Sequence, residues 1–146
     1  MTKIGVVGYS DDKIFNHDIA KALLAIVFDI IDKEYRDIEI VSGLTNMGVP
    51  KLAYEMADKR GWKTVGLSAK EAKEYDCYDV DEEIIVGEKF GSESVEFINY
   101  INCLIRIGGG KQSMKETEKA KEKDIPVYEY DLPEKKWKYL ENYYVE

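Results

Sequence analysis

Histidine is nearly absent from this chain, with His17 as its only instance among 146 residues. This scarcity disfavours a histidine-centred catalytic triad and a histidine-based metal site, so we expect no bound metal. Cysteine is also rare, and Cys77 and Cys103 lie too far apart to form a Cys-x-x-Cys motif. We therefore expect two free thiols in a reducing cytoplasm, with Cys103 in an apolar strand.

Positive charge is in short supply, because 21 Lys and Arg residues stand against 29 Asp and Glu residues. The formal net charge of −8 argues against a nucleic-acid partner, since phosphate backbones are held by clustered cations. Long apolar runs are missing too, and the amino terminus lacks a basic segment followed by an apolar one. The sequence therefore predicts a cytoplasmic protein with no membrane partner.

Short apolar segments alternate with segments of helical periodicity along most of the chain. Strands are predicted at residues 3–8, 38–42, 64–67, 83–87, 103–107 and 126–130, and helices at about 15–33, 50–60, 68–75, 94–102 and 113–124. Strands with apolar residues on both faces are typical of a parallel sheet covered by helices. The pattern predicts an α/β protein of three layers, built on a mostly parallel sheet of about six strands.

The chain has the length and apolar content of one compact domain, residues 1–146, and no linker or repeat divides it. We expect its core at about residues 3–131, followed by a C-terminal aromatic tail at 132–146. Trp137, Leu140 and Tyr144 recur in that tail at helical spacing. This spacing predicts a short helix that covers the sheet or joins a dimer.

The strongest functional signal is a run of three glycines between the fifth predicted strand and a polar helix. Glycine lets the backbone turn sharply and approach a ligand closely, and the N–H groups that open a helix attract anions. We therefore predict a phosphate site formed by Gly108, Gly109, Gly110, Lys111, Gln112 and Ser113. Glu116 follows one turn later and is the candidate catalytic or sugar-binding carboxylate.

Glycines and polar residues also follow the first two predicted strands, at the sheet edge where α/β proteins bind their ligands. These further candidate contacts are Gly8, Tyr9, Ser10, Gly43, Asn46, Met47 and Gly48. Close packing, turn formation and helix capping could account for them equally well. The glycine run could likewise be a plain turn, and Ser113-x-x-Glu116 has the spacing of a capping box.

These motifs resemble those of the lysine-decarboxylase-like or LONELY GUY proteins, within the SLOG superfamily that includes molybdenum-cofactor carrier-like domains. Gly109-Gly-Lys-Gln-Ser-Met-Lys-Glu116 is similar to the family's Gly-Gly-x-Gly-Thr-x-x-Glu, with Gln112 at the third glycine and Ser113 at the threonine. The segment from Ser42 to Gly48 is similar to the family's Gly-Gly…Leu-Met-Gly. The resemblance implies a Rossmann-like fold with the strand order 3-2-1-4-5-6. We also expect the protein to form a homodimer.

The same resemblance implies a reaction, because family phosphoribohydrolases split a nucleoside 5′-monophosphate into free base and ribose 5-phosphate. Glu116 matches the carboxylate of that chemistry. This sequence departs from the family where an Arg-Lys or Arg-Asn pair precedes the glycine loop, since Glu93 and Ser94 stand there. Other cations that could take over the role are Lys89, Arg106 and Lys111.

Two functions follow from these observations. The first is binding of a nucleotide or another phosphorylated ligand by the glycine-rich loop, with no cofactor required. The alternative is an N-glycosidic hydrolase of the phosphoribohydrolase type, which releases the base from a nucleoside 5′-phosphate. In both cases the expected partner is a small-molecule nucleotide or sugar phosphate. A third possibility is a purely scaffolding domain whose pocket is vestigial.

Overall fold

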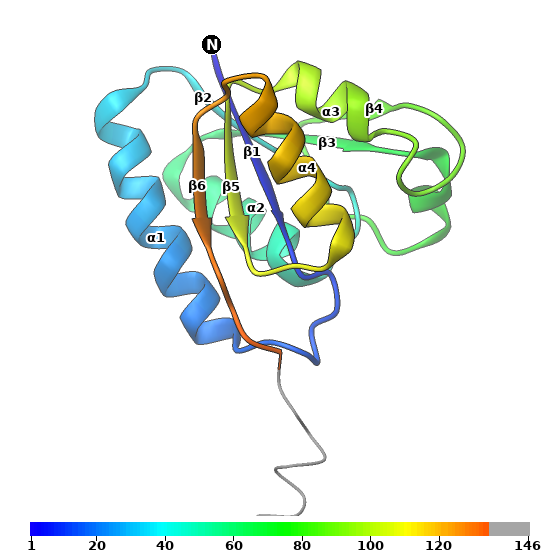
Figure 1. Cartoon of the computed structure of the whole chain (residues 1–146), viewed down its shortest axis with the longest axis horizontal. Coiled ribbons are helices and arrows are strands. Elements are labelled where there is room, and N and C mark those ends of the chain that lie inside the picture. Colours follow the sequence, from blue (N-terminus) through cyan, green and yellow to red (C-terminus); the bar gives the residue numbers. More distant parts are fainter. Residues whose placement is uncertain (135–146) are drawn as a thin grey trace, which may run out of the picture.

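The computed structural model describes residues 1–134, which form one sheet of six strands flanked by helices (Figure 1). The strands are β1 (Thr2–Gly8), β2 (Ile38–Ser42), β3 (Lys63–Ser68), β4 (Glu82–Ile85), β5 (Cys103–Ile107) and β6 (Val127–Tyr130). Every neighbouring pair in this sheet is parallel. The predicted tail helix with Trp137, Leu140 and Tyr144 lies outside the described residues.

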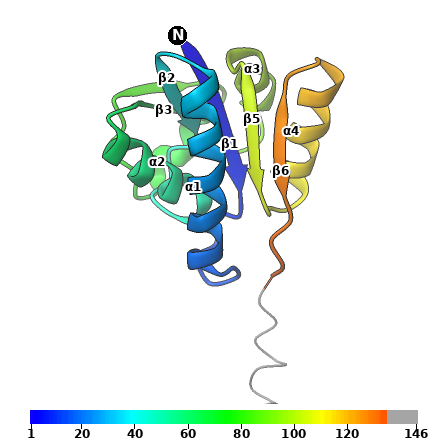
Figure 2. The same ribbon diagram turned by 90° about the vertical axis from the view of Figure 1, so that its left-hand side faces the viewer.

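Helices cover both faces of the sheet (Figure 2). One face carries α1 (His17–Glu34) and α2 (Gly48–Arg60), and the other carries α3 (Ser94–Tyr100) and α4 (Lys111–Glu122). A 3-10 turn, η1 (Lys70–Glu74), follows β3 where the sequence predicts a short helix. The three-layer α/β class is therefore confirmed. No helix within residues 1–134 combines the length and apolarity needed to cross a membrane.

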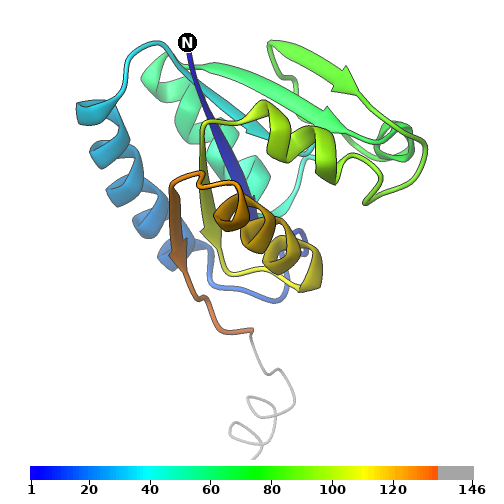
Figure 3. The same cartoon turned by 45° about the horizontal axis from the view of Figure 1, so that its top comes forward.

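The strands lie in the order β4-β3-β2-β1-β5-β6, so the predicted order 3-2-1-4-5-6 is wrong for β4. β4 pairs with β3 at the sheet edge (Figure 3), and β5 takes the place beside β1. Burial accounts for this placement, because every residue of β5 is buried whereas the four residues of β4 are mostly exposed. A short, charged strand suits an edge, where it discourages pairing with other chains.

Helix α1 forms where helical periodicity predicts it, but not all of its apolar residues are buried. Ile19 and Ile26 are 50% and 54% exposed. The residues that α1 buries against the sheet are Ala20, Leu24, Val27, Phe28 and Ile31. The helix thus carries apolar residues on two sides, and only one side contributes to the core.

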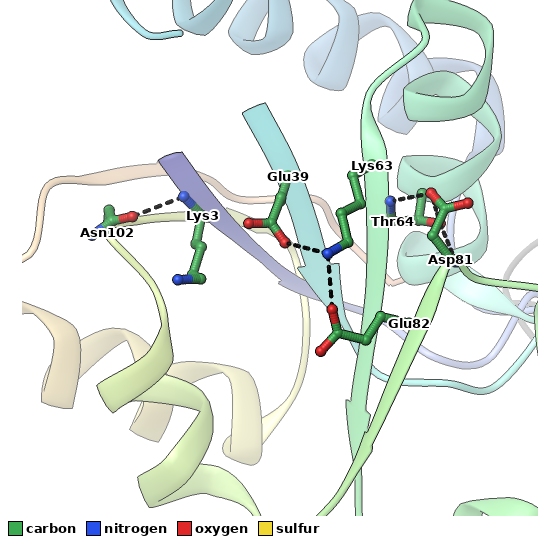
Figure 4. A network of polar contacts seen from close by, with 7 residues as sticks. All are labelled: Lys3, Glu39, Lys63, Thr64, Asp81, Glu82 and Asn102. Atoms are coloured by element: carbon green, nitrogen blue, oxygen red, sulfur yellow. Dashed lines mark hydrogen bonds and ion pairs between the residues drawn. The ribbon is translucent and has the colours of Figure 1, made fainter. Parts of the chain in front are cut away.

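A cluster of charged side chains lies at the amino-terminal ends of the strands (Figure 4). Glu39 of β2 is 1% exposed, and neither carboxylate oxygen has a hydrogen-bond partner among the described residues. The Lys63 ammonium lies 3.6 Å from Glu39 Oε1 and 2.8 Å from Glu82 Oε1. Lys63 therefore supplies the countercharge that a buried carboxylate requires.

Candidate ligand-binding site

A pocket of about 620 Å³ lies at the carboxyl ends of the strands. Its walls come from the ends of β1, β2 and β3, from the loops that follow them, and from the start of α4. The loops after the neighbouring strands β1 and β5 lead to helices on opposite faces of the sheet. Rossmann-like sheets bind their ligands in the crevice that opens at such a point.

The glycine loop reaches the pocket through its last residue, Gly110. Gly108 has φ 62°, and a Cβ atom there would lie 2.5 Å from a ring carbon of Tyr9. A Cβ atom at Gly109 would lie 2.5 Å from Ser113 Oγ. Gly108 and Gly109 do not line the pocket themselves, so they shape the turn that brings Gly110 to it.

Helix α4 begins at Lys111, two residues before the predicted start, and Gly110 is its N-cap residue. No side chain caps this helix, and the Ser113 hydroxyl lies inside its first turn, 3.5 Å from the Gly8 carbonyl oxygen. The capping-box explanation of Ser113 and Glu116 is therefore wrong. Because the first N–H groups of a helix have no partner within the helix, those of α4 remain available to a ligand.

Two buried carboxylates line the pocket, from Glu93 just before α3 and from Glu116 in α4. They are 8% and 6% exposed, respectively. Burial and, to a lesser extent, the nearby Glu93 carboxylate raise the pKa of Glu116 to about 7, although the Ser94 side chain and Lys119 oppose this rise. The described residues include no group of three His, Cys, Asp or Glu side chains arranged for a metal ion.

The candidate cations occupy different places. Arg106 is 4% exposed and does not line the pocket, because its guanidinium faces the backbone and the acidic side chains next to β6. Lys89 is exposed, lies 3.8 Å from the Glu71 carboxylate and does not line the pocket either. Lys111 does line it, and it is the only cationic side chain among the described residues that do.

The loops after β1 and β2 supply five of the predicted contacts. Gly8, Tyr9 and Ser10 line the pocket from the β1 side, and Gly43 and Met47 line it from the β2 side. From α4 and the glycine loop, the predicted residues that line it are Gly110, Lys111, Gln112, Ser113 and Glu116. Ten of the fourteen predicted residues thus meet in one cavity.

Asn46 and Gly48 do not line the pocket but join its loops together. The Gly48 N–H donates to the Asp12 carboxylate at 2.8 Å, and the Asn46 side-chain amide donates to the Asp76 carboxylate at 3.0 Å. The Asp12 carboxylate therefore accepts a hydrogen bond from the first residue of α2, whereas Asn16 caps α1. Helix capping is therefore wrong as an explanation for the polar residues that directly follow the first strand.

The pocket also has an aromatic wall, which the sequence motifs do not indicate. Tyr75, in the loop after β3, and Phe90, in the loop after β4, have ring centroids 5.7 Å apart. They are 52% and 46% exposed, and the Phe90 N–H donates to the Glu71 carboxylate at 3.0 Å. Large aromatic side chains in two loops at strand ends are the signal that could have identified them.

No protein-family model matches this sequence, and no curated protein sequence matches it. The fold does have solved counterparts. The molybdenum cofactor carrier protein of Chlamydomonas reinhardtii is 21% identical with a TM-score of 0.69, over 88% of this chain and 75% of that chain. The molybdenum cofactor binding protein of the phototrophic bacterium Rippkaea orientalis gives the same four values.

A third similar structure is TM1055, a structural genomics target, with 21% identity and a TM-score of 0.69 over 87% of this chain and 72% of that chain. At such identities the likeness establishes the fold. The Rossmann-like fold that the SLOG resemblance implies is therefore confirmed.

Proposed function

We propose that this chain binds a nucleotide or another phosphorylated small molecule, with its phosphate on the backbone N–H groups at the start of α4. The observation that carries this proposal is the uncapped N-terminus of α4, which opens into a pocket of about 620 Å³. N–H groups and helix dipole together favour an anion there. Lys111 adds the one cationic side chain of the described lining.

Two further observations support a ligand of this kind. The aromatic wall of Tyr75 and Phe90 offers a surface for a planar ring, such as a nucleobase. Two of the similar structures are described as a carrier protein and a binding protein for the molybdenum cofactor. Both the aromatic wall and these two similar structures agree with ligand binding without catalysis.

The hydrolase alternative has one specific observation in its favour. Glu116 is buried in the same pocket as the proposed phosphate site, and its pKa is raised to about 7. Cleavage of an N-glycosidic bond passes through an oxocarbenium-like state, which a carboxylate can stabilise or supply with an activated water. Base release with loss of activity in a Glu116→Gln variant would identify this reaction.

One experiment separates the two functions. The protein and its Glu116→Gln variant are incubated with nucleoside 5′-monophosphates and 5′-diphosphates while base release is followed by chromatography and melting by thermal shift. Stabilisation without base release is the expected result, because a ligand that binds only the folded state raises its stability. Base release by the parent protein alone favours the hydrolase, and no response to any phosphorylated ligand contradicts both functions.

We also propose that the protein forms a homodimer through α1. Its outer side exposes the apolar side chains of Ile19 and Ile26, which a second copy of the chain would cover. Light scattering after size-exclusion chromatography tests this proposal. A dimer that dissociates in an Ile26→Glu variant is expected, whereas a monomeric parent protein contradicts it.

A further inference from the structure

The described part of the chain ends at the pocket. Leu132 is 4% exposed and packs into the core, and Glu134, the last described residue, lines the pocket. Burial and, after it, the Glu134 carboxylate raise the pKa of Tyr9, another residue of the lining, so the two side chains lie close together. Residues 135–146 therefore continue the chain from the wall of the pocket.

The pocket is acidic except at the start of α4. Among the described residues, its lining contains the carboxylates of Asp11, Glu93, Glu116 and Glu134 against the single cation of Lys111. Glu93 and Glu116 are more than nine-tenths buried, and neither has an ion-pair partner within residues 1–134. Because transfer of a lone ion from water is costly, buried carboxylates favour a positive charge beside them. The lining therefore favours a cationic group inside the pocket.

The aromatic wall of the pocket is open to solvent. Tyr75 and Phe90 are 52% and 46% exposed, and their ring centroids lie 5.7 Å apart. An exposed pair of rings offers an apolar surface on which a further aromatic side chain can pack in offset or edge-to-face geometry. An occupant that carries both an aromatic ring and positive charge therefore suits this pocket.

The chain itself carries a segment of this chemistry directly after Glu134. Residues 135–138 read Lys-Lys-Trp-Lys, and Tyr139 and Leu140 follow them. This concentration of lysine contrasts with the whole chain, in which 29 acidic residues stand against 21 basic ones. Trp137 is three residues from Glu134, a stretch of chain that spans up to about 10 Å. The segment therefore needs no long connection to reach the pocket.

We propose that residues 135–140 bind in the pocket of their own chain when it holds no ligand, with Trp137 on the aromatic wall. Their lysines then lie near Glu93 and Glu116 and supply the positive charge that these buried carboxylates lack. The contact itself is independent of the proposed function. Its consequence rests on that function, because the segment would compete with a phosphorylated ligand for the same cavity and lower the apparent affinity for it.

The fluorescence of Trp137 reports on this contact directly. The chain has two tryptophans, and Trp62, the other one, does not line the pocket, so a full-length Trp62→Phe variant has Trp137 as its only indole. Without ligand, its emission is expected to be blue-shifted and to be quenched by acrylamide several-fold less efficiently than that of N-acetyl-tryptophanamide. If Trp62→Phe does not fold, the difference in emission between the parent protein and Trp137→Phe gives the same information. Emission and quenching equal to those of the free amide overturn the proposal.

Two matched double variants in the same single-tryptophan background locate the contact. Tyr75→Ala/Phe90→Ala is expected to bring the quenching of Trp137 close to that of the free amide. Ile85→Ala/Val95→Ala is the control, because it removes two apolar side chains that are 43% and 54% exposed and do not line the pocket. Equal quenching in the two double variants overturns the placement on the aromatic wall. Protection that increases with protein concentration assigns the segment to the pocket of a second copy and overturns the contact within one chain.

Calorimetric titration with AMP, GMP, CMP and UMP tests the competition. The tightest of these ligands is expected to expose Trp137 as it saturates the protein, and to bind about fivefold more tightly to Trp137→Ala than to the parent protein. Trp62→Phe is the control, with unchanged affinity. Binding that leaves Trp137 protected overturns the competition. If Trp137 is protected and none of the four nucleotides binds, the proposed function fails and the contact stands, whereas an exposed Trp137 with nucleotide binding gives the reverse.

Discussion

Arg106 Nη1 donates a hydrogen bond to the carbonyl oxygen of Gly108 at 2.9 Å. The same guanidinium lies 3.1 Å from Glu129 Oε1 and 2.8 Å from Asp131 Oδ1. A buried arginine near the end of β5 thus holds the first residue of the glycine loop without lining the pocket itself. Arg106 therefore supports the conformation of the loop.

Replacing Arg106 with Met is expected to lower the free energy of unfolding by about 1.5–3 kcal/mol, the usual cost of losing a hydrogen bond from a charged group. The loop would lose its internal support, so ligand affinity should fall as well. Urea unfolding and calorimetry measure the two effects. Arg36→Met is the control, since Arg36 is exposed, and an equally small loss in both variants contradicts the role of Arg106.

The conformation of Gly108 leads to a second prediction. Gly61 and Gly108 have similar φ angles, 73° and 62°, but a Cβ atom at Gly61 would meet no atom within 4 Å. At Gly108 it would overlap the ring of Tyr9 and lie 2.9 Å from Leu132 Cβ. Gly61→Ala should therefore cost only the left-handed backbone strain, about 1–2 kcal/mol, and Gly108→Ala should cost more.

Urea unfolding of both alanine variants measures this difference. The excess loss at Gly108 isolates the steric part, because the backbone strain is common to the two positions. Equal losses would mean that Tyr9 moves away without cost, and that the loop does not require the close packing of Tyr9 on Gly108.

The central strands could be predicted because their signal is local. The segments 38–42 and 103–107 are mostly apolar, interrupted only by Glu39, Ser42 and Arg106, and both match the observed bounds of β2 and β5. The place of β4 in the sheet could not be predicted from its own residues. It depends on which strand occupies the position beside β1, and that follows from a competition in burial between β4 and β5.

In the candidate site, too, only the residues that lie close together in the sequence could be predicted. The glycine run and Glu116 are neighbours in sequence, so one motif indicates them together. Tyr75 and Phe90 belong to loops after two different strands, and only the pairing of β3 with β4 brings them to one pocket. Glu93 could be located by the resemblance, but its burial beside Glu116 required the packing of α3 against α4.

The raised pKa of Glu116 predicts that stability falls as the pH rises. Its pKa is about 7 in the folded protein, above the ordinary value of 4.5, so the folded state retains a proton that the unfolded state loses between these pH values. The free energy of unfolding should therefore decrease over this window, by up to about 3 kcal/mol, and level off above it.

Glu116→Gln mimics the protonated carboxyl group and should remove this dependence. Urea unfolding at pH 5 and pH 8 would then give a smaller decrease in the variant than in the parent protein. Glu118→Gln serves as the control, because Glu118 is exposed on the same helix. Parallel pH profiles of parent and Glu116→Gln would contradict the assignment.

The pair of Glu39 and Lys63 predicts a non-additive effect on stability. Lys63→Met should lower the melting temperature by several degrees, because it leaves the buried Glu39 carboxylate without its countercharge. Glu39→Gln should be nearly neutral or stabilising, since a buried charge is removed. The double variant should recover most of the loss, and additive losses in a double-mutant cycle would show that the two groups are independent.

The N-cap position of α4 allows stability and ligand binding to be changed in opposite directions. Gly110 has φ −96°, and a Cβ atom there would meet nothing within 4 Å, so a side chain fits without strain. Asp at an N-cap accepts a hydrogen bond from the helix N–H groups and interacts favourably with the helix dipole. Gly110→Asp should therefore stabilise the protein by about 0.5 kcal/mol while placing a carboxylate where the phosphate is proposed to bind.

Affinity for a nucleoside monophosphate is then expected to fall by about tenfold or more in Gly110→Asp, because the carboxylate competes for the same N–H groups and repels the phosphate. Gly110→Asn is the matched control, since it caps the helix with a side chain of the same size and no charge. A much smaller loss in Gly110→Asn attributes the effect to charge at the start of α4. Undiminished binding by Gly110→Asp would place the phosphate elsewhere in the pocket, and equal losses in the two variants would assign the effect to the size of the side chain.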